Sequence, residues 1–310
     1  MTEIQTEQPQ NLSDMFSFVE RKQINPFLFV GLSLIFIFFM YQVIGGLITY
    51  LLVGALPTAE TATAHRLLTA SGQILFILVP TVILTRLFTK KSSLFFPWRL
   101  PRAAETFFAI MGLFALQQVF QIYLVYQDRI PLPYELKEII QSAKRILEEV
   151  FEVLVKSRSI GELTFVLVIV AFIPAVVEEA LFRGFVQGSL SKYIDPVKAA
   201  LVSGTIFAFS HLDIINLIPL IALGCYFSVL RMRSNSIIIA MTVHFVNNAL
   251  AVIAVYFGLN DETFLTGMSG VSANDSLLLS QLVLYVLFFA FCFVAYLRVT
   301  RSGTDIEENE

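Results

Sequence analysis

Long apolar segments separated by short polar ones form the main pattern along this chain. Eight of these segments approach or exceed the length of about 20 residues that crosses the hydrocarbon core of a bilayer. They comprise residues 27–54, 69–88, 104–126, 162–187, 196–212, 214–230, 235–257 and 277–297. The pattern therefore predicts an all-α fold, a polytopic membrane helix bundle of about eight transmembrane helices.

The polar stretch between the third and fourth segments has a periodicity of its own. Between Pro133 and Ser159, apolar residues recur at helical spacing, and Glu and Lys occupy the other face. The apolar positions are Leu136, Ile139, Ile140, Ala143, Leu147, Val150, Phe151 and Leu154. This spacing predicts one amphipathic helix that lies at the membrane interface or caps the bundle.

These patterns divide the chain into six parts. The parts are a polar N-terminal tail (1–25), N-terminal transmembrane helices (26–128), the amphipathic extramembrane segment (129–160), a membrane core (161–257), an outer loop with the last transmembrane helix (258–300) and a polar C-terminal tail (301–310). Lys and Arg gather in the short loops on the side of the N-terminus, and the loop at 258–276 has none. The positive-inside rule then predicts that both termini are cytoplasmic. On this arrangement, His65 and Arg66 lie in an outer loop before the second span.

The composition agrees with a membrane protein and excludes several other classes. Of the 310 residues, 56% belong to the apolar set AVILMFWYC and only 15% are charged, against about 25% charged in soluble domains. A net charge of −3 without a basic stripe excludes a nucleic-acid binder. Cys225 and Cys292 both lie in apolar runs, so neither a disulfide framework nor a cysteine-based zinc site is expected.

Three ionisable residues interrupt the fourth apolar segment, namely Glu178, Glu179 and Arg183. A charge at the centre of a membrane helix costs roughly 2.5–3.5 kcal/mol on insertion scales, so such a cluster is expected to face a protein interior or a wet cavity. Glu179 and Arg183 are four residues apart and can pair on one helical face, as a structural clamp or as support for a site. Glu178 points about 100° away from Glu179, which leaves its carboxylate free for another task.

Proline and glycine add two local expectations to this segment. Pro174 removes a backbone hydrogen bond and should open or kink the helix just before the acidic pair. Gly184 and Gly188 are four residues apart and should allow a neighbouring helix to approach closely.

Two of the three histidines lie in later apolar segments. His211 ends the fifth segment, and His244 shares a helical face with Asn248, four residues on. Counted along their spans, Glu178, His211 and His244 lie roughly 15–23 Å deep, near the middle of a core about 30 Å thick. A carboxylate and an imidazole at a cavity can activate water, and a second His with an amide can stabilise an oxyanion. This set suits hydrolysis of a peptide bond.

Three motifs in this order resemble the CPBP family of intramembrane proteases. The motifs are Glu178-Glu179-x-x-x-Arg183, Phe207-x-x-x-His211 and His244-x-x-x-Asn248, on successive apolar segments. That family includes CAAX prenyl endopeptidases, bacteriocin-processing and self-immunity proteins, and "abortive infection" proteins. The resemblance covers about residues 160–257 and does not extend to residues 1–159.

The resemblance implies a role for each motif residue. Glu178 would activate the attacking water, and His211 would share that work. His244 and Asn248 would stabilise the oxyanion, and the remaining residues would support them: Glu179 and Arg183 by holding the catalytic groups in place, Phe207 by shaping the wall.

The resemblance leaves the need for a metal open. Family members are often described as metalloproteases, so Glu178, His211 and His244 could form a three-ligand zinc site with Glu179 as the base. The chain has no His-Glu-x-x-His pair, and a glutamate-activated water needs no further residue. Zn²⁺ is therefore a candidate cofactor, and the metal-free version is slightly favoured.

The leading hypothesis is an intramembrane endopeptidase whose partners are the lipid bilayer and a membrane-associated protein or peptide substrate, with no nucleic acid. Bacteriocin processing or self-immunity is a more specific version of it. A catalytically silent membrane scaffold or regulator is the alternative, followed by a proton-coupled transporter, because midplane acids and histidines also occur in proton pathways. With no organelle address in the sequence, the expected location is the plasma membrane of a prokaryote.

Overall fold

The computed structural model describes residues 16–259 and 275–307, with side chains as far as residue 300. Every element in this part is a helix, and seven continuous helical stretches are long and apolar enough to cross a membrane. These are Pro26–Val53, Ala62–Phe88, Ala103–Asp128, Ile160–Leu190, Leu217–Ser234, Ile237–Tyr256 and Asp275–Thr300. An eighth apolar helix, Pro196–Ser210, has 15 residues. The predicted all-α polytopic bundle of about eight helices is confirmed.

Three of the long stretches are composed of several elements. The first contains α2 (Pro26–Phe38), η2 (Phe39–Gly45) and α3 (Gly46–Val53), and the second contains α4 (Ala62–Gly72), η3 (Gln73–Leu78) and α5 (Val79–Phe88). The fourth contains α8 (Ile160–Val166), η5 (Leu167–Phe172), α9 (Ile173–Glu179), η6 (Ala180–Val186) and α10 (Gln187–Leu190). The other helices are α1 (Phe18–Arg21), α6 (Ala103–Asp128), α7 (Tyr134–Val155), α11 (Pro196–Ser210), α12 (Leu217–Ser234), α13 (Ile237–Tyr256) and α15 (Asp275–Glu307), with a short 3₁₀ turn, η4 (Ser92–Leu94).

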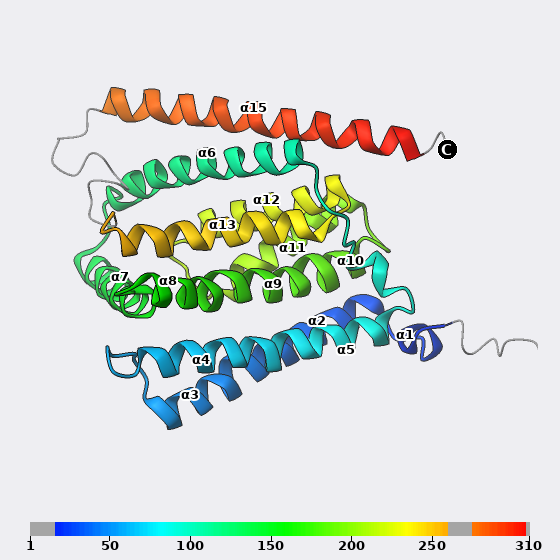
Figure 1. The fold of residues 1–310 in the computed structure, drawn as a ribbon, viewed down its shortest axis with the longest axis horizontal. Helices are drawn as coiled ribbons and strands as arrows, with labels where there is room; N and C mark the ends of the chain where they lie inside the picture. Colours follow the sequence, from blue (N-terminus) through cyan, green and yellow to red (C-terminus); the bar gives the residue numbers. More distant parts are fainter. Residues whose placement is uncertain (1–15, 260–274, 308–310) are drawn as a thin grey trace, which may run out of the picture.

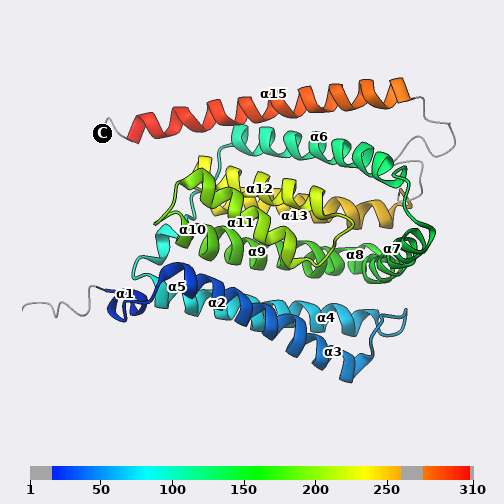
Figure 2. The same cartoon turned by 180° about the vertical axis from the view of Figure 1, so that it is seen from behind.

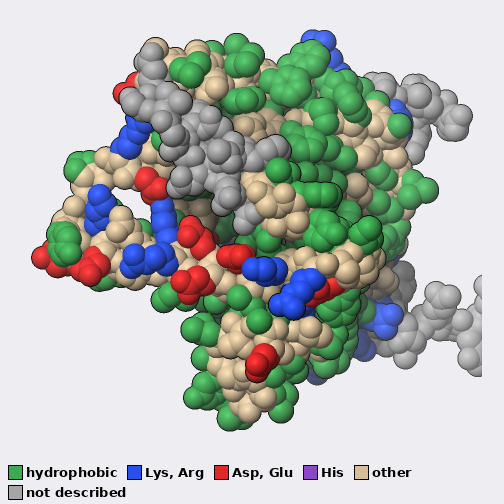
Figure 3. Space-filling view, turned by 60° about the vertical axis from the view of Figure 1, so that its left-hand side comes forward, with side chains coloured by type: hydrophobic (Ala, Val, Ile, Leu, Met, Phe, Trp, Pro, Cys, Tyr) green, Lys and Arg blue, Asp and Glu red, His purple; other side chains and the backbone are tan. Residues whose placement is uncertain are grey.

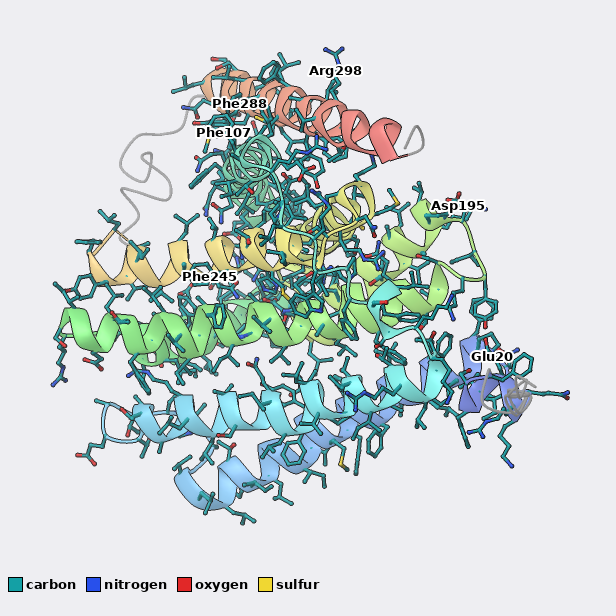
Figure 4. All side chains as sticks on the ribbon, turned by 45° about the vertical axis from the view of Figure 1, so that its right-hand side comes forward. Glu20, Phe107, Asp195, Phe245, Phe288 and Arg298 are labelled. Carbon is teal, nitrogen blue, oxygen red and sulfur yellow. The ribbon has the colours of Figure 1, made fainter. Side chains whose placement is uncertain are left out.

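The helices pack in layers around the fourth stretch. In Figure 1, α15 and α6 form one outer layer, α8 to α13 form the middle, and α2 to α5 form the other outer layer. The view from behind shows the same order, with α11 beside α9 and α12 (Figure 2). Helix α1 lies at the same end of the bundle as the last turns of α15, and Glu20 and Asp195 also lie toward that end (Figure 4).

Helix α7 lies across the opposite end of the bundle (Figures 1 and 2). Its Lys, Arg and Glu side chains form a charged band on the surface there (Figure 3). The predicted helix between residues 133 and 159 is confirmed, whereas its place at a bilayer interface stays a prediction. Residues 1–15 of the predicted N-terminal tail, residues 260–274 of the predicted outer loop and residues 308–310 of the C-terminal tail lie outside the described residues.

The second span begins at Ala62, earlier than the predicted residue 69, and this places His65 and Arg66 within helix α4. The prediction that they lie in an outer loop was wrong, because both are buried, with 6% and 3% of their surface exposed. The Arg66 guanidinium donates to the carbonyl oxygens of Val153, Leu154 and Lys156 at the end of α7 and pairs with a carboxylate on α8. A hydropathy pattern counts this arginine as polar, although the fold satisfies its charge.

The turns of the helix widen before Glu178 and Glu179, as the position of Pro174 led us to expect. Pro174 lies in the first turn of α9, directly after the π-helical segment η5. Because proline has no N–H and its ring would collide with the carbonyl of residue 170, the hydrogen-bond register changes there. A second π-helical segment, η6, follows Glu179, so wider turns flank the acidic pair on both sides.

Gly184 and Gly188 do form close contacts, but the predicted partner, a neighbouring spanning helix, was wrong. A Cβ added at Gly184 would lie 2.3 Å from the ring of Phe96, and one at Gly188 would lie 2.8 Å from Phe95. These rings belong to the connection between α5 and α6 rather than to another spanning helix. The close helix approach lies elsewhere, where a Cβ at Gly204 of α11 would be 2.4 Å from the backbone nitrogen of Cys225 in α12. Spacing along the chain could not predict this contact, because its members lie on different helices.

We expect Gly204→Ala to destabilise the protein by roughly 1–3 kcal/mol or more, since the added methyl must displace backbone atoms. Gly31→Ala is the matched control, because no atom lies within 4 Å of its added Cβ. Thermal unfolding of both variants in detergent measures the difference. Equal unfolding temperatures for the two variants would contradict the close approach of α11 and α12.

Candidate active site

Glu178 and His211 come together from two helices. Glu178 lies on α9 with 17% of its side chain exposed, and His211 caps the end of α11 with 32% exposed. Leu212 follows with φ +54°, the left-handed conformation that ends many helices. The distance between His211 Nε2 and Glu178 Oε2 is 3.7 Å, longer than a direct hydrogen bond. Both atoms can therefore bond to the same third group.

The hydrogen bond of His211 Nδ1 determines whether Nε2 carries a proton in the neutral ring. His211 Nδ1 lies 2.8 Å from the carbonyl oxygen of Phe207, one turn earlier on α11. Because a carbonyl only accepts, Nδ1 carries the proton and donates it. In the neutral ring, Nε2 then presents a lone pair toward Glu178, so the pair contains one carboxylate and one imidazole acceptor.

Both residues line an apolar cavity of about 550 Å³. Its lining comes from α2 and η2, η3, α9 and η6, and the end of α11. The lining residues are Leu34, Ile35, Ile37, Phe38, Tyr41, Gln42, Ile77, Glu178, Leu181, Phe182, Ile206, Phe209, Ser210, His211 and Leu212. Glu178 and His211 are the two residues in this set that can carry a charge near neutral pH. The cavity is thus an apolar pocket with one reactive pair, a combination typical of ligand sites.

A second polar cluster lies fully buried next to this pair. Glu179 has no exposed surface, and its two oxygens contact different partners. His244 Nδ1 lies 2.8 Å from Oε1 and donates to it, and Arg183 Nε lies 3.0 Å from Oε2. The ion pair that the four-residue spacing predicted is present. The bond to His244, which joins α9 to α13, could not be inferred from spacing.

Aromatic rings complete the surroundings of this cluster. The Arg183 guanidinium lies 4.6 Å from the ring centre of Phe207 and 5.5 Å from that of Phe227, and it donates to the carbonyl of Gly224. The His244 ring stacks on Phe227 at 5.1 Å. Cation–π contacts and charge-assisted bonds offset part of the desolvation of a buried arginine. The cluster therefore joins α9, η6, α11, α12 and α13.

Phe207 lies between the two clusters. Its ring centre is 4.5 Å from that of His211 and 5.8 Å from that of His244. Its carbonyl also holds the His211 ring. Phe207 thus contacts both clusters, although the residue itself does not line the cavity.

Asn248 lies one turn after His244 on α13. Its Oδ1 accepts a hydrogen bond from Asn247 Nδ2 at 3.2 Å, and Asn247 Oδ1 accepts one from Gln117 of α6. The structure therefore separates the predicted site residues. Glu178 and His211 line the cavity, whereas His244 and Asn248 do not.

The predicted zinc ligands do not fit a metal site. Among the described residues, no group of three His, Cys, Asp or Glu side chains is arranged to hold a metal ion. A catalytic zinc needs three such ligands in tetrahedral geometry, and His244 does not line the cavity that Glu178 and His211 line. Among the described residues, Glu178, His211 and His244 thus do not form this set.

Sequence reasoning missed the contribution of the first span to the cavity. Tyr41 and Gln42 line the cavity with four apolar residues of α2. The two form a polar pair within a long apolar segment, which was the available signal. The side of the helix that faces the core depends on packing, so the pattern alone could not place them.

Comparison with known proteins identifies one related segment. Residues 160–250 match the family model described as "Type II CAAX prenyl endopeptidase Rce1-like". This segment contains all seven predicted site residues, and the resemblance inferred from the three motifs is confirmed there. No curated protein and no protein of solved structure matches the chain.

We expect Glu179→Gln to destabilise the protein by roughly 3–5 kcal/mol, because it leaves the buried Arg183 without its counter-charge. Glu152→Gln serves as the control, since Glu152 forms an exposed pair with Lys156, and exposed pairs contribute about 0–1 kcal/mol. The readout is the thermal unfolding temperature in detergent. If both variants unfolded at the wild-type temperature, the buried cluster would not hold these helices together.

Proposed function

We propose that this chain is an intramembrane endopeptidase, because residues 160–250 match the family model of Rce1-like type II CAAX prenyl endopeptidases. It hydrolyses a peptide bond in a membrane-associated protein or peptide. The observation that supports this most strongly is the pair of Glu178 and His211, 3.7 Å apart on the wall of an apolar cavity. A pocket of this kind admits an apolar chain and keeps one carboxylate within reach of it.

The first step of the proposed reaction is the activation of a water molecule by Glu178. The Glu178 carboxylate takes a proton from the water, and the water oxygen bonds to the carbonyl carbon of the substrate. His211 Nε2 accepts the second hydrogen bond of that water and orients it. A carboxylate and an imidazole acceptor 3.7 Å apart can contact one water in this way.

The second step is the breakdown of the tetrahedral intermediate. The C–N bond breaks, and Glu178 returns its proton to the leaving nitrogen, so that a carboxylic acid and an amine are formed. A general acid–base group that both takes and gives the proton restores the starting state of the enzyme. No other nucleophile from the chain is needed.

We assign the oxyanion of this intermediate to Asn248 and His244. The Asn248 Oδ1 is used by Asn247, which leaves its amide hydrogens available as donors. The neutral His244 ring gives its Nδ1 proton to Glu179, so donation from Nε2 requires the imidazolium form. Glu179 orients the His244 ring, and Arg183 holds Glu179 in place. Because neither donor lines the cavity, this assignment requires α13 to approach the substrate when it binds.

The proposed activity extends to a substrate class and a cellular location. The chain is a multi-pass membrane protein, and we propose the cell membrane with both termini in the cytoplasm. Processing of a secreted peptide, or self-immunity toward one, fits a protease whose cavity is formed by spanning helices. The match to a family model of prenyl endopeptidases makes prenylated peptides the first substrates to compare with leader peptides.

We expect Glu178→Gln to lower the rate of cleavage by about 10²–10⁴-fold, the usual contribution of a general base. The assay uses purified protein in lipid with fluorogenic prenylated CAAX peptides and leader peptides. Glu152→Gln on the exposed face of α7 is the matched control and should keep the wild-type rate. Each protein is measured with and without a strong chelator, and the glutamate mechanism predicts no effect of the chelator.

Two results would contradict this proposal in different ways. Loss of activity in chelator, restored by zinc, would replace the metal-free mechanism but keep the protease. Full cellular function of the Glu178→Gln variant would contradict the proposal that the chain is a protease. A scaffold or regulator would then explain the chain better, and proton uptake in vesicles would test the transporter.

We expect Asn248→Ala to lower kcat about 10²–10³-fold, the loss measured for single oxyanion donors. Asn247→Ala is the neighbouring comparison and should have a smaller effect, since it removes only the link between Gln117 and Asn248. Steady-state kinetics on a cleaved peptide measure both. An Asn248→Ala enzyme with wild-type kcat would remove this residue from the mechanism.

A further inference from the structure

We propose that the first spanning helix, α2 with η2, is the substrate-recognition element of this site. Leu34, Phe38 and Tyr41 would hold the apolar segment of the substrate against Glu178 and His211. This inference rests on the proposed function, because it names the residues that present the substrate to that pair. The helix lies outside the segment that matches the family model.

The first support is the share of the cavity that this helix forms. Six of the lining residues belong to α2 and η2, and they face the Glu178 side of the bundle. Leu34, Phe38 and Tyr41 are spaced by four and three residues, so they lie on one helical face. The wall opposite the reactive pair thus comes largely from one helix.

The second support is the way Tyr41 is held. Its ring packs against the end of α4, where a Cβ added at Gly72 would lie 3.5 Å from Tyr41 Cε2. Tyr41 lines the cavity together with Glu178. Within the described part of the chain, the buried Gln73 Oε1 has no hydrogen-bond partner. The packed Tyr41 ring therefore brings a phenol group to the cavity wall, and its hydroxyl can donate to a backbone carbonyl of the substrate.

The third support is the rim of the cavity. Ile35 on α2 is 66% exposed, and across the opening Phe209 and Leu212 at the end of α11 are 58% and 66% exposed. An apolar rim on a spanning bundle opens toward lipid rather than toward water. Apart from Glu178 and His211, the lining has no Lys, Arg, Asp, Glu or His. The cavity therefore favours an uncharged, apolar segment that enters from the bilayer between α2 and α11.

Photocross-linking tests this inference without requiring cleavage. The probe is an apolar octapeptide with a central diazirine-bearing leucine, added to the protein in lipid vesicles, and the labelled residues are mapped by mass spectrometry. We expect labelling at residues 34–42, above that from a diazirine fatty acid. Leu34→Trp should reduce that labelling about tenfold, because it fills the cavity. Leu32→Trp on the same helix, outside the lining, should leave it unchanged.

Kinetics add a readout that a structural role would not change. Phe38→Leu should raise KM about tenfold at nearly constant kcat, within the range for a changed hydrophobic contact in a pocket. Phe36→Leu is its matched control, since Phe36 is also exposed but does not line the cavity. The unfolding temperatures of all variants are compared to detect loss of folding.

The outcomes separate this inference from the proposed function. In one outcome, Leu34→Trp removes the labelling of α2 and η2, but the protein cleaves no peptide. This result would support the recognition element and contradict the proposal that the chain is a protease. In the other outcome, the protein cleaves peptides, but α2 and η2 are not labelled, or Leu34→Trp and Leu32→Trp have equal effects on labelling. This result would overturn the recognition element and leave the proposed protease activity intact. Equal KM values for Phe38→Leu and Phe36→Leu would also overturn it.

Discussion

The buried pair of Glu179 and Arg183 is the interaction on which the rest of this structure depends. Neither side chain has exposed surface, so each charge must be compensated inside the protein. His244, the carbonyl of Gly224 and the rings of Phe207 and Phe227 provide that compensation. Because these groups come from α11, α12 and α13, satisfying one ion pair fixes the mutual positions of the helices around it.

The position of Glu178 follows from this constraint. As the preceding residue on α9, it points about 100° away from Glu179, toward the cavity rather than the buried cluster. Phe207 holds His211 through its carbonyl while its ring contacts Arg183, so the buried cluster also places the imidazole. One acid thus stabilises the bundle, and the other faces an apolar pocket where a carboxylate can act on a substrate.

Local features of the site could be predicted from the sequence, and features that depend on packing could not. Apolar periodicity predicted the spans, and four-residue spacing predicted the Glu179–Arg183 pair, because both depend on one helix. Arg66 was misplaced because distant carbonyls satisfy its charge. The Gly204 contact and the cavity wall around Tyr41 were missed because each requires knowing which faces of two helices meet.

We propose that the two adjacent acids have separate tasks, and one paired measurement tests this division. Glu178→Gln and Glu179→Gln are purified together, and cleavage rate and unfolding temperature are measured on the same samples. We expect Glu178→Gln to unfold at the wild-type temperature and to be inactive, whereas Glu179→Gln should unfold at a clearly lower temperature. A stable, inactive Glu179→Gln beside an active Glu178→Gln would contradict it.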